Sequence, residues 1–395
     1  MRIVLVVPGG VDPPGAPRTI PFIHHLVESM SADHQVTVLA VGHDPHPGEW
    51  RLFDADVINI PIGEHSKGDI LRVVAAATRA ASRDGRPDVV HGLWANLPGL
   101  VAGTVGRRHG APAVVSVGGG EFARVPDIGY GGGLHVGTRR LAGAAVRLAT
   151  TVTVATEWMR TQLAADGIVV DEVIPLGADA RIFYSRPVQV ADPMQLNPMQ
   201  LVHVGSLNRV KDQDLLVRAM AELGAIGVEA HLTMVGGDTM DGHHARLATE
   251  LGVGERITFT GQLPPAQVAD VVRGASWHVL TSRHDAGPVA VLEAAACGVP
   301  TIGVRVGHVA DFTRPDVEPA AVPIDEHTPI AAARAIARTL TGDDRPAIAE
   351  RAERWARTHD ADATARAFEV LYRRLAANSS RRAAASSGSR PRRNR

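Results

Sequence analysis

The chain is poor in cysteine, lysine and aromatic residues, and it has no long apolar run. Its 395 residues include a single cysteine, Cys297, which excludes an intramolecular disulfide and a multi-cysteine metal site and is consistent with a reducing compartment. No stretch approaches the ~20 uninterrupted apolar residues of a membrane span. The apolar run at the N-terminus is too short for the core of a signal peptide. We therefore expect a soluble, cytoplasmic protein, with peripheral membrane contact left open.

Composition and charge indicate an α/β protein with an aliphatic core and a basic C-terminal segment. Hydrophobic residues make up 45% of the chain and aromatic residues only 4%, so the core should consist mainly of aliphatic side chains. Six arginines and no acid follow residue 378; without them the formal charge changes from −1 to −7. The low complexity of residues 379–395 predicts a disordered, solubilising tail. Contact of this basic tail with anionic lipid or nucleic acid is the alternative, and we expect no nucleic-acid partner.

Short β-rich runs alternate with helix-period segments along the chain, as in parallel sheets built from βαβ units. The expected strands are residues 3–7, 35–41, 57–62, 88–91, 113–117, 152–155, 172–175, 201–204, 231–235, 256–260, 278–281 and 301–304. The expected helices are residues 19–31, 69–83, 98–108, 138–148, 157–165, 213–223, 244–251, 265–274, 289–296, 329–340 and 347–377. This alternation predicts two doubly wound, Rossmann-like domains that face each other across a cleft.

Three prolines fall in the dozen or so residues after Tyr184, which indicates an interdomain linker. The predicted organisation is a first domain at 1–183, a linker at 184–199, a second domain at 200–345, helices at 346–378 that pack back on the first domain, and the tail at 379–395. Doubly wound sheets bind ligands outside the carboxyl ends of their strands. The segments that follow each strand are therefore the ones to search for a site.

Two glycine-containing loops follow the first strand of each domain. Residues 8–15 (PGGVDPPG) include Gly10 and precede a helix, so their backbone can approach an anion near the helix N-terminus; a plain turn explains them equally well. Residues 204–212 end near Lys211, and Lys67 is the only other lysine in an arginine-rich chain. A compact ammonium suits phosphate binding, whereas the alternative is a solvated helix start. Gly236 is expected in a tight turn beside the cleft.

The segment 281–300 places two carboxylates eight positions apart, Asp285 before an apolar helix and Glu293 within it. A carboxylate directed at an apolar interior costs several kcal/mol unless it is paired, so Glu293 should face a cavity or meet a donor. Pro288 suits the first turn of the helix, whose free N–H groups, near Gly287 and Val289, would face an anion. Carboxylates for sugar hydroxyls, together with a helix N-terminus and cations for a diphosphate, fit a sugar nucleotide.

These residues resemble a known family. Residues 285–300 (DAGPVAVLEAAACGVP) are similar to the acid-x7-acid element of retaining, nucleotide-sugar-dependent glycosyltransferases with the GT-B fold, the glycosyltransferase family 4. Residues 175–183 (PLGADARIF) resemble the family's Pro-x-Gly-x-Asp-x-x-x-Phe, and residues 205–211 (GSLNRVK) its Gly-Arg-Leu-x-x-x-Lys. The order and spacing agree from about residue 3 to 375. The resemblance implies that the first domain holds the acceptor and the second the nucleotide sugar.

By the same resemblance, Glu293 binds the donor ribose, Asp285 the transferred sugar, and Lys211 with a nearby arginine the diphosphate. Three positions depart from the family pattern. The first acid is usually Glu, and the arginine of the Gly-Arg-Leu motif is replaced by Ser206, for which Arg209 is a substitute. The family's His-Gly is replaced by residues 117–121 (VGGGE), so Glu121 or backbone amides would have to take the place of the histidine.

The predicted site residues fall into three groups. The predicted donor-binding residues are Gly10, Gly205, Ser206, Arg209, Lys211, Gly236, Asp285, Gly287, Pro288, Val289 and Glu293. The predicted catalytic residues are Asp285, Lys211 and Glu121. The predicted acceptor-side residues are His91, Trp94, Gly119 and Glu121, although a lone histidine such as His91 is more often a packed core residue. No ligand spacing for a metal is present.

We therefore expect a hexosyltransferase of carbohydrate biosynthesis, which moves a hexosyl group with retention from a nucleoside diphosphate sugar to an unidentified carbohydrate, lipid or small-molecule acceptor. No cofactor or metal is expected, because cations and amides can oppose the charge of the leaving diphosphate; the nucleotide sugar is a co-substrate. Two alternatives are a sugar-nucleotide isomerase or epimerase on the same scaffold, and a nucleotide-sugar-binding protein without turnover. The oligomeric state is not predicted.

Overall fold

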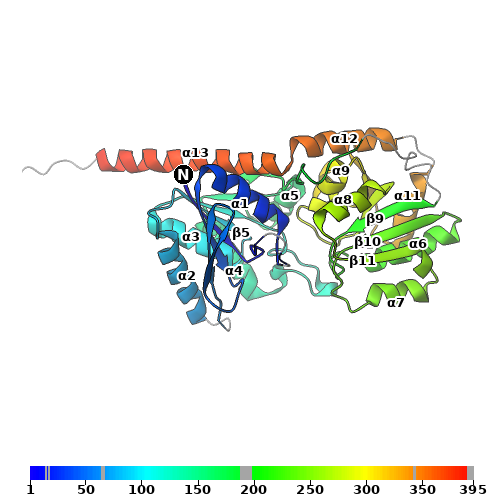
Figure 1. Cartoon of the computed structure of the whole chain (residues 1–395), viewed down its shortest axis with the longest axis horizontal. Helices are drawn as coiled ribbons and strands as arrows, with labels where there is room; N and C mark the ends of the chain where they lie inside the picture. Colours follow the sequence, from blue (N-terminus) through cyan, green and yellow to red (C-terminus); the bar gives the residue numbers. More distant parts are fainter. Residues whose placement is uncertain (14–15, 17, 64–66, 187–197, 341–343, 389–395) are drawn as a thin grey trace, which may run out of the picture.

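The computed structural model describes residues 1–13, 16, 18–63, 67–186, 198–340 and 344–388. These residues form two α/β units side by side, each built on its own largely parallel sheet, with a long helix running along one edge of the molecule (Figure 1). The predicted fold class is confirmed. The predicted linker lies largely outside the described residues, and the predicted domain boundaries stay predictions.

The first sheet has eight strands in the order β3-β4-β2-β1-β5-β6-β7-β8. Its strands are β1 (Arg2–Val7), β2 (Gln35–Val41), β3 (Gly48–Leu52), β4 (Ala55–Ile60), β5 (Val89–Leu93), β6 (Ala113–Ser116), β7 (Thr151–Val154) and β8 (Glu172–Val173). All neighbours pair in parallel except β3, an antiparallel edge strand that the sequence did not predict. Strands β1 and β2 are apolar and buried almost throughout, as expected of parallel strands covered on both faces.

Helices cover both faces of this sheet. They are α1 (Pro21–Asp33), α2 (Lys67–Ala81), α3 (Leu97–His109), α4 (Val136–Leu148) and α5 (Glu157–Ala165). One face of β1, with Ile3 and Leu5, packs against α1 and the C-terminal helix, whereas Val4 and Val6 face α2 and α3. Helix α4 packs beside α3. This layering leaves the carboxyl ends of the strands and the loops that follow them as one edge of the domain.

The second sheet has six parallel strands in the order β11-β10-β9-β12-β13-β14. Its strands are β9 (Met199–Val204), β10 (Ala230–Val235), β11 (Ile257–Gly261), β12 (Trp277–Leu280), β13 (Thr301–Val304) and β14 (Ala321–Ile324). Its helices are α6 (Gln213–Ala225), α7 (His243–Glu250), α8 (Pro265–Arg273), α9 (Val289–Ala296), α10 (Gly307–Phe312) and α11 (Pro329–Arg338). Helices α6, α7 and α11 cover one face, and α8, α9 and α10 the other.

The last two helices connect the domains. Helix α12 (Arg345–Thr358) packs on α9 of the second domain, and α13 (Ala361–Gly388) lies along α1 of the first. The chain crosses beside Gly177, where an added Cβ would stand 2.1 Å from the His359 carbonyl oxygen. The predicted return of the C-terminal helix is thus confirmed, but α12 stays with the second domain.

The basic tail differs from its prediction. Helix α13 continues to Gly388, so residues 379–388, expected to be disordered, extend a helix already anchored by Phe368 and Tyr372 in the core. Residues 389–395 lie outside the described residues. Among the described helices, none has an apolar stretch long enough to cross a membrane.

Candidate active site

The loops that follow β6 and β12 meet where the carboxyl ends of the two sheets face each other. A Cβ added to Gly119 would lie 2.3 Å from the Ala286 Cβ, so only glycine fits this approach. Its φ of +117° also favours glycine. The carbonyl oxygen of Gly119 lies 3.0 Å from Nε2 of His284, on the opposite loop. Gly119, predicted on the acceptor side, therefore touches the second domain directly.

Further contacts join the two domains around this point. Arg283 pairs with Asp127 at 2.8 Å, and the Thr156 hydroxyl donates to the Ala286 carbonyl oxygen at 2.6 Å. The carboxylate of Asp311, on α10, accepts the backbone N–H groups of residues 157 and 158 at 2.9 and 2.8 Å. A helix of the second domain thus caps α5 of the first. Sequence reasoning missed these contacts, although Arg283 and His284 directly precede Asp285.

The loop after β9 carries the predicted diphosphate-binding residues. Ser206 and Arg209 are exposed, and Arg209 forms no ion pair with a described residue. Gly205 passes close to Gly236, where an added Cβ would stand 2.1 Å from the Gly205 carbonyl oxygen. The two predicted donor-binding glycines therefore let the loops after β9 and β10 pack against each other.

Lys211 and Asp285 are brought together from positions 74 residues apart. The Lys211 ammonium donates to the Asp285 carboxylate, and both side chains are mostly shielded from solvent. The Thr281 hydroxyl donates to the Lys211 carbonyl oxygen at 2.9 Å, and the Arg283 N–H to that of Val210 at 2.8 Å. These bonds hold the loops after β9 and β12 side by side. The pair joins the two residues that the sequence singled out for the diphosphate and the sugar.

Helix α9 begins at Val289, with Pro288 at its N-cap. An added Cβ on Gly287 would lie 2.6 Å from the Cβ of Ala155 in the first domain, so this glycine sits at the domain contact. Glu293 is half-buried on the second turn. Burial raises the pKa of its carboxyl to about 7, and no described residue donates a hydrogen bond to it. Of the two predicted alternatives, a cavity or a donor, the structure shows no hydrogen-bond donor to the Glu293 carboxyl among the described residues.

Glu121 differs from its predicted role. It is 5% exposed, and its carboxylate accepts the backbone N–H groups of Ala95, Gly118 and Gly119 at 2.8, 2.9 and 2.6 Å. Burial is the largest effect on its pKa, which is raised. Both oxygens are thus occupied by backbone donors, so Glu121 fixes the shape of the loop after β6. This arrangement contradicts a role as a free catalytic or acceptor-binding carboxylate.

The acceptor-side prediction for His91 is wrong. The ring is fully buried, and its nitrogens lie 2.5 Å from the Tyr372 hydroxyl and 2.7 Å from that of Ser116. Burial lowers the pKa of His91 to about 3. His91 is a core residue that links β5 to α13. Trp94, by contrast, is half-buried and covers Gly118, where an added Cβ would stand 2.2 Å from its Nε1.

Gly10 lies at the carboxyl end of β1, in the first domain, with a φ of +75°. An added Cβ would collide with the Ile20 side chain at 2.3 Å, so the glycine serves the turn into α1; its part in donor binding stays a prediction. Beside it the sequence missed a charged cluster: Asp12 lies 2.6 Å from His43 and 3.0 Å from Arg18. This cluster joins the loop after β1 to the loop after β2.

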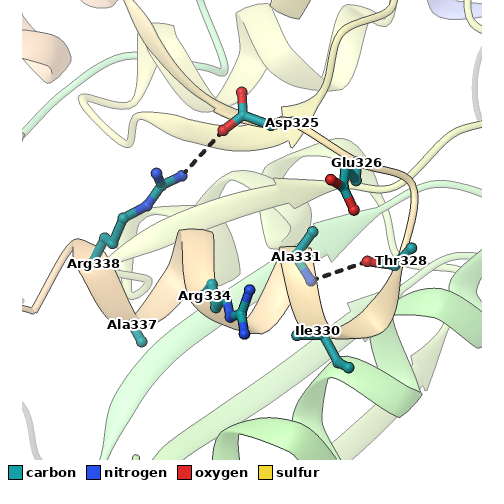
Figure 2. A pocket seen from close by; sticks show the side chains of 8 residues that line it. All are labelled: Asp325, Glu326, Thr328, Ile330, Ala331, Arg334, Ala337 and Arg338. Atoms are coloured by element: carbon teal, nitrogen blue, oxygen red, sulfur yellow. Dashed lines mark hydrogen bonds and ion pairs between the residues drawn. The ribbon is translucent and has the colours of Figure 1, made fainter.

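The described residues offer no metal site, and they form a groove along α11. The described residues contain no group of three or more His, Cys, Asp or Glu side chains placed to hold a metal ion. A surface groove of about 860 Å³ lies along α11 (Figure 2). Its Asp325 and Arg338 lie 3.7 Å apart, and Thr328 caps the helix through the Ala331 N–H. His327, which lies between the groove residues Glu326 and Thr328, contacts the Asp212 carboxylate at 2.7 Å. One end of the groove thus lies next to the loop that carries Lys211.

Two glycosyltransferase family models match the chain, one in each half. The family described as "Glycosyl transferases group 1" matches residues 192–358, and the "Glycosyl transferase 4-like domain" matches residues 20–177. A D-inositol 3-phosphate glycosyltransferase of Acidothermus cellulolyticus is 29% identical over 371 residues, which cover 85% of this chain and 80% of the relative. A second one, of Catenulispora acidiphila, is 28% identical over 323 residues, 74% of each protein.

Solved structures agree on the fold. Sucrose-phosphate synthase from Thermosynechococcus elongatus superposes with a TM-score of 0.77 at 20% identity, covering 96% of this chain and all of that one. The HepE protein of Anabaena, solved in complex with UDP-glucose, superposes with a TM-score of 0.69 at 17% identity, covering 93% and 99%. With both domains matched in sequence and the arrangement matched in structure, this chain belongs to the group 1 glycosyltransferases with the GT-B fold, and it is a transferase of glycosyl groups.

Proposed function

We propose that the protein transfers a hexosyl group, with retention at the anomeric carbon, from a nucleoside diphosphate sugar to an acceptor held by the first domain. The observation that carries the proposal is the ion pair between Lys211 and Asp285. It brings together a cation suited to a diphosphate and a carboxylate suited to sugar hydroxyls, on two loops beside the domain contact. A donor that lies across both loops replaces this pair by its own contacts.

The chemistry asks mainly for stabilisation of charge. As the glycosidic bond breaks, the electron pair goes to the leaving diphosphate, whose negative charge is opposed by the Lys211 ammonium and the N-terminus of α9. Arg209, which has no ion pair with a described residue, is the further cation on the same loop. Preorganised groups of this kind lower the barrier because they need no rearrangement when the charge develops.

Glu293 is assigned to the ribose of the donor. Its carboxyl has no protein donor among the described residues, and burial raises its pKa to about 7. Hydroxyl groups that donate to the carboxylate favour its charged form and compensate for the lost water. Binding therefore couples the nucleoside to the ionisation of Glu293. A ribose at this position would supply the hydrogen-bond donors that the protein does not provide to Glu293.

The similar proteins support the choice of substrates to test. HepE of Anabaena was solved with UDP-glucose, so UDP-hexoses are the first donors. The curated relatives are named for D-inositol 3-phosphate, which is the first acceptor. Contacts such as His284 to Gly119 and Arg283 to Asp127 close the cleft over the substrates. Closure of this kind excludes water and limits hydrolysis of the donor.

The test is a panel of UDP-, GDP- and ADP-sugars, followed by thermal shift and by donor consumption with and without acceptor. Lys211→Ala and Glu293→Ala should abolish the thermal shift and the turnover, whereas Glu250→Ala, at an exposed acid at the end of α7, should leave both unchanged. Unaltered donor binding in both cleft variants would contradict the site.

The stereochemistry and the reaction class need separate readouts. The anomeric configuration of the product, read by NMR, tests retention, and an inverted product rejects it. Conversion of the donor sugar to an isomer without any acceptor would favour an isomerase or epimerase. A donor that binds but is not consumed across the acceptor panel would favour a binding protein.

A further inference from the structure

A second hollow lies on the first domain, between α4 and the turn that joins α5 to β8. Its volume is about 750 Å³, within the range of sites that bind ligands. Arg139, Arg140 and Arg147 of α4 line it, together with Phe122 and Arg124 from the loop after β6 and Val169 from the turn. We refer to it as the α4 groove. None of its lining residues belongs to the donor site.

The charges of the α4 groove are not balanced within the protein. Arg139, Arg140 and Arg147 are exposed, and none forms an ion pair with a described residue. The acids in the groove are already engaged: Asp166 pairs with Arg124 at 2.9 Å, and Asp171 accepts the Val152 N–H at 2.7 Å. The lining holds four arginines and two aspartates, a net charge of +2, and three of the arginines have no ion-pair partner among the described residues, which favours an anionic partner.

The helix is amphipathic in a way that suits an interface. Ala142 and Ala145 are buried against the domain, while Val136 and the arginines occupy the outer surface at helical spacing. Val136 is 54% exposed and Val169, across the groove, 77% exposed. Apolar side chains that flank unpaired arginines are typical of elements that lie at a lipid surface, because the arginine stems also cover apolar area.

We propose that the α4 groove docks the protein on an anionic phospholipid surface, with head-group phosphates accepting hydrogen bonds from Arg139, Arg140 and Arg147. Arginine binds phosphate through paired N–H donors, and Val136 and Val169 enter the boundary of the acyl chains. This site is separate from the proposed donor site and does not depend on it.

The loop after β6 connects docking to the cleft. Its Gly119 contacts the second domain at Ala286 and His284, and three residues further on Phe122 begins to line the α4 groove. Glu121 holds the loop between them through backbone hydrogen bonds. One loop of the first domain thus takes part both in the α4 groove and in the contact between the domains.

The test is co-sedimentation of the full-length protein with phosphatidylcholine vesicles, with and without phosphatidylglycerol. We expect binding only to the anionic vesicles, weakened by salt. The double variant Arg139→Ala/Arg147→Ala should lose about thirtyfold in affinity, given the contribution of each arginine near an anionic surface. Val169→Asp should weaken binding at constant arginine content. Thermal unfolding confirms that each variant is folded.

A matched control removes the same charge elsewhere. Arg218→Ala/Arg334→Ala changes two exposed arginines of the second domain and should leave vesicle binding unchanged; an equal loss in both doubles would overturn the proposal. So would a loss in Arg390→Ala/Arg392→Ala/Arg393→Ala with none in the groove double, since the tail would then be the docking element. Release from vesicles by soluble glycerol phosphate would assign the groove to a free phosphate ester instead.

Discussion

The side chains of Lys211 and Asp285 form an ion pair between the loops that follow β9 and β12. Each therefore neutralises the other in the protein alone, and in the proposed reaction a donor diphosphate would compete with Asp285 for the same ammonium. Binding of the diphosphate would then release the carboxylate toward the sugar.

Asp285→Asn separates these two roles. Without the carboxylate charge, Lys211 is free, so the affinity for a sugar-free nucleoside diphosphate should rise several-fold while transfer falls about 100-fold, as for other groups that act in the transition state. Calorimetry with UDP and turnover with the full donor measure the two effects. An equal decrease in both would show that Asp285 only maintains the fold of the loop.

Glu293→Gln should stabilise the protein in alkaline solution. Burial raises the pKa of Glu293 to about 7 from 4.5, so the folded state holds the proton more tightly than the unfolded chain. The neutral carboxyl stabilises the fold below pH 4.5, and this contribution is lost as the pH rises through about 7. The melting temperature of the variant should therefore exceed that of the wild type at pH 8 and approach it near pH 5. A difference independent of pH would contradict the assignment.

Gly236→Ala should disturb the loop after β9, because the new Cβ would stand 2.1 Å from the Gly205 carbonyl oxygen. The control is Gly261→Ala, at a residue with a φ of +69° and no atom within 4 Å of an added Cβ. The control bears only the backbone strain of about 1 to 2 kcal/mol. We expect the larger loss of melting temperature, and a higher KM for the donor, in Gly236→Ala. Equal effects would mean that the two loops do not depend on their close packing.

Asp311→Ala should loosen the contact between the domains. The carboxylate caps α5 through the N–H groups of residues 157 and 158, and loss of a cap costs about 1 kcal/mol. Small-angle scattering should show a larger radius of gyration, and turnover should decrease with the melting temperature little changed. Asp316→Ala, which removes an exposed partner of Arg314, is the control. A compact Asp311 variant with normal turnover would contradict the role.

The sequence predicted regular elements well where the apolar pattern is strong. Residues 289–296 and 301–304 were expected as a helix and a strand, and α9 and β13 occupy those residues. The short α10 and the edge strand β3, with its exposed Glu49 and Arg51, lack such a pattern. Strand β3 is defined by its antiparallel hydrogen bonds to β4 and not by an apolar pattern of its own.

The residues of the proposed site could be selected from local sequence features, but contacts between residues far apart in the sequence could not be predicted. Lys211, Asp285 and Glu293 stand out through residue type and position, because each follows a strand or lies on an apolar helix. His91 also lies in such a place, yet its ring meets Tyr372, 281 residues away. Asp311 caps a helix more than 150 residues before it. Partners so distant in sequence leave no local signal. The core position of His91 and the capping role of Asp311 therefore became visible only in the folded structure.

The crossing beside Gly177 and His359 sets the mechanics of the whole molecule. The chain passes from the first domain to the second before β9 and returns between α12 and α13, and the N–H of Ala361 donates to the carbonyl oxygen of Ala178 at 3.0 Å. Two spans pinned to each other resist sliding and leave rotation as the soft movement. We therefore expect the domains to rotate about this crossing as a hinge. The ion pair between Arg283 and Asp127 would hold the closed state. In the proposed reaction, the same rotation would admit the donor and release the nucleoside diphosphate.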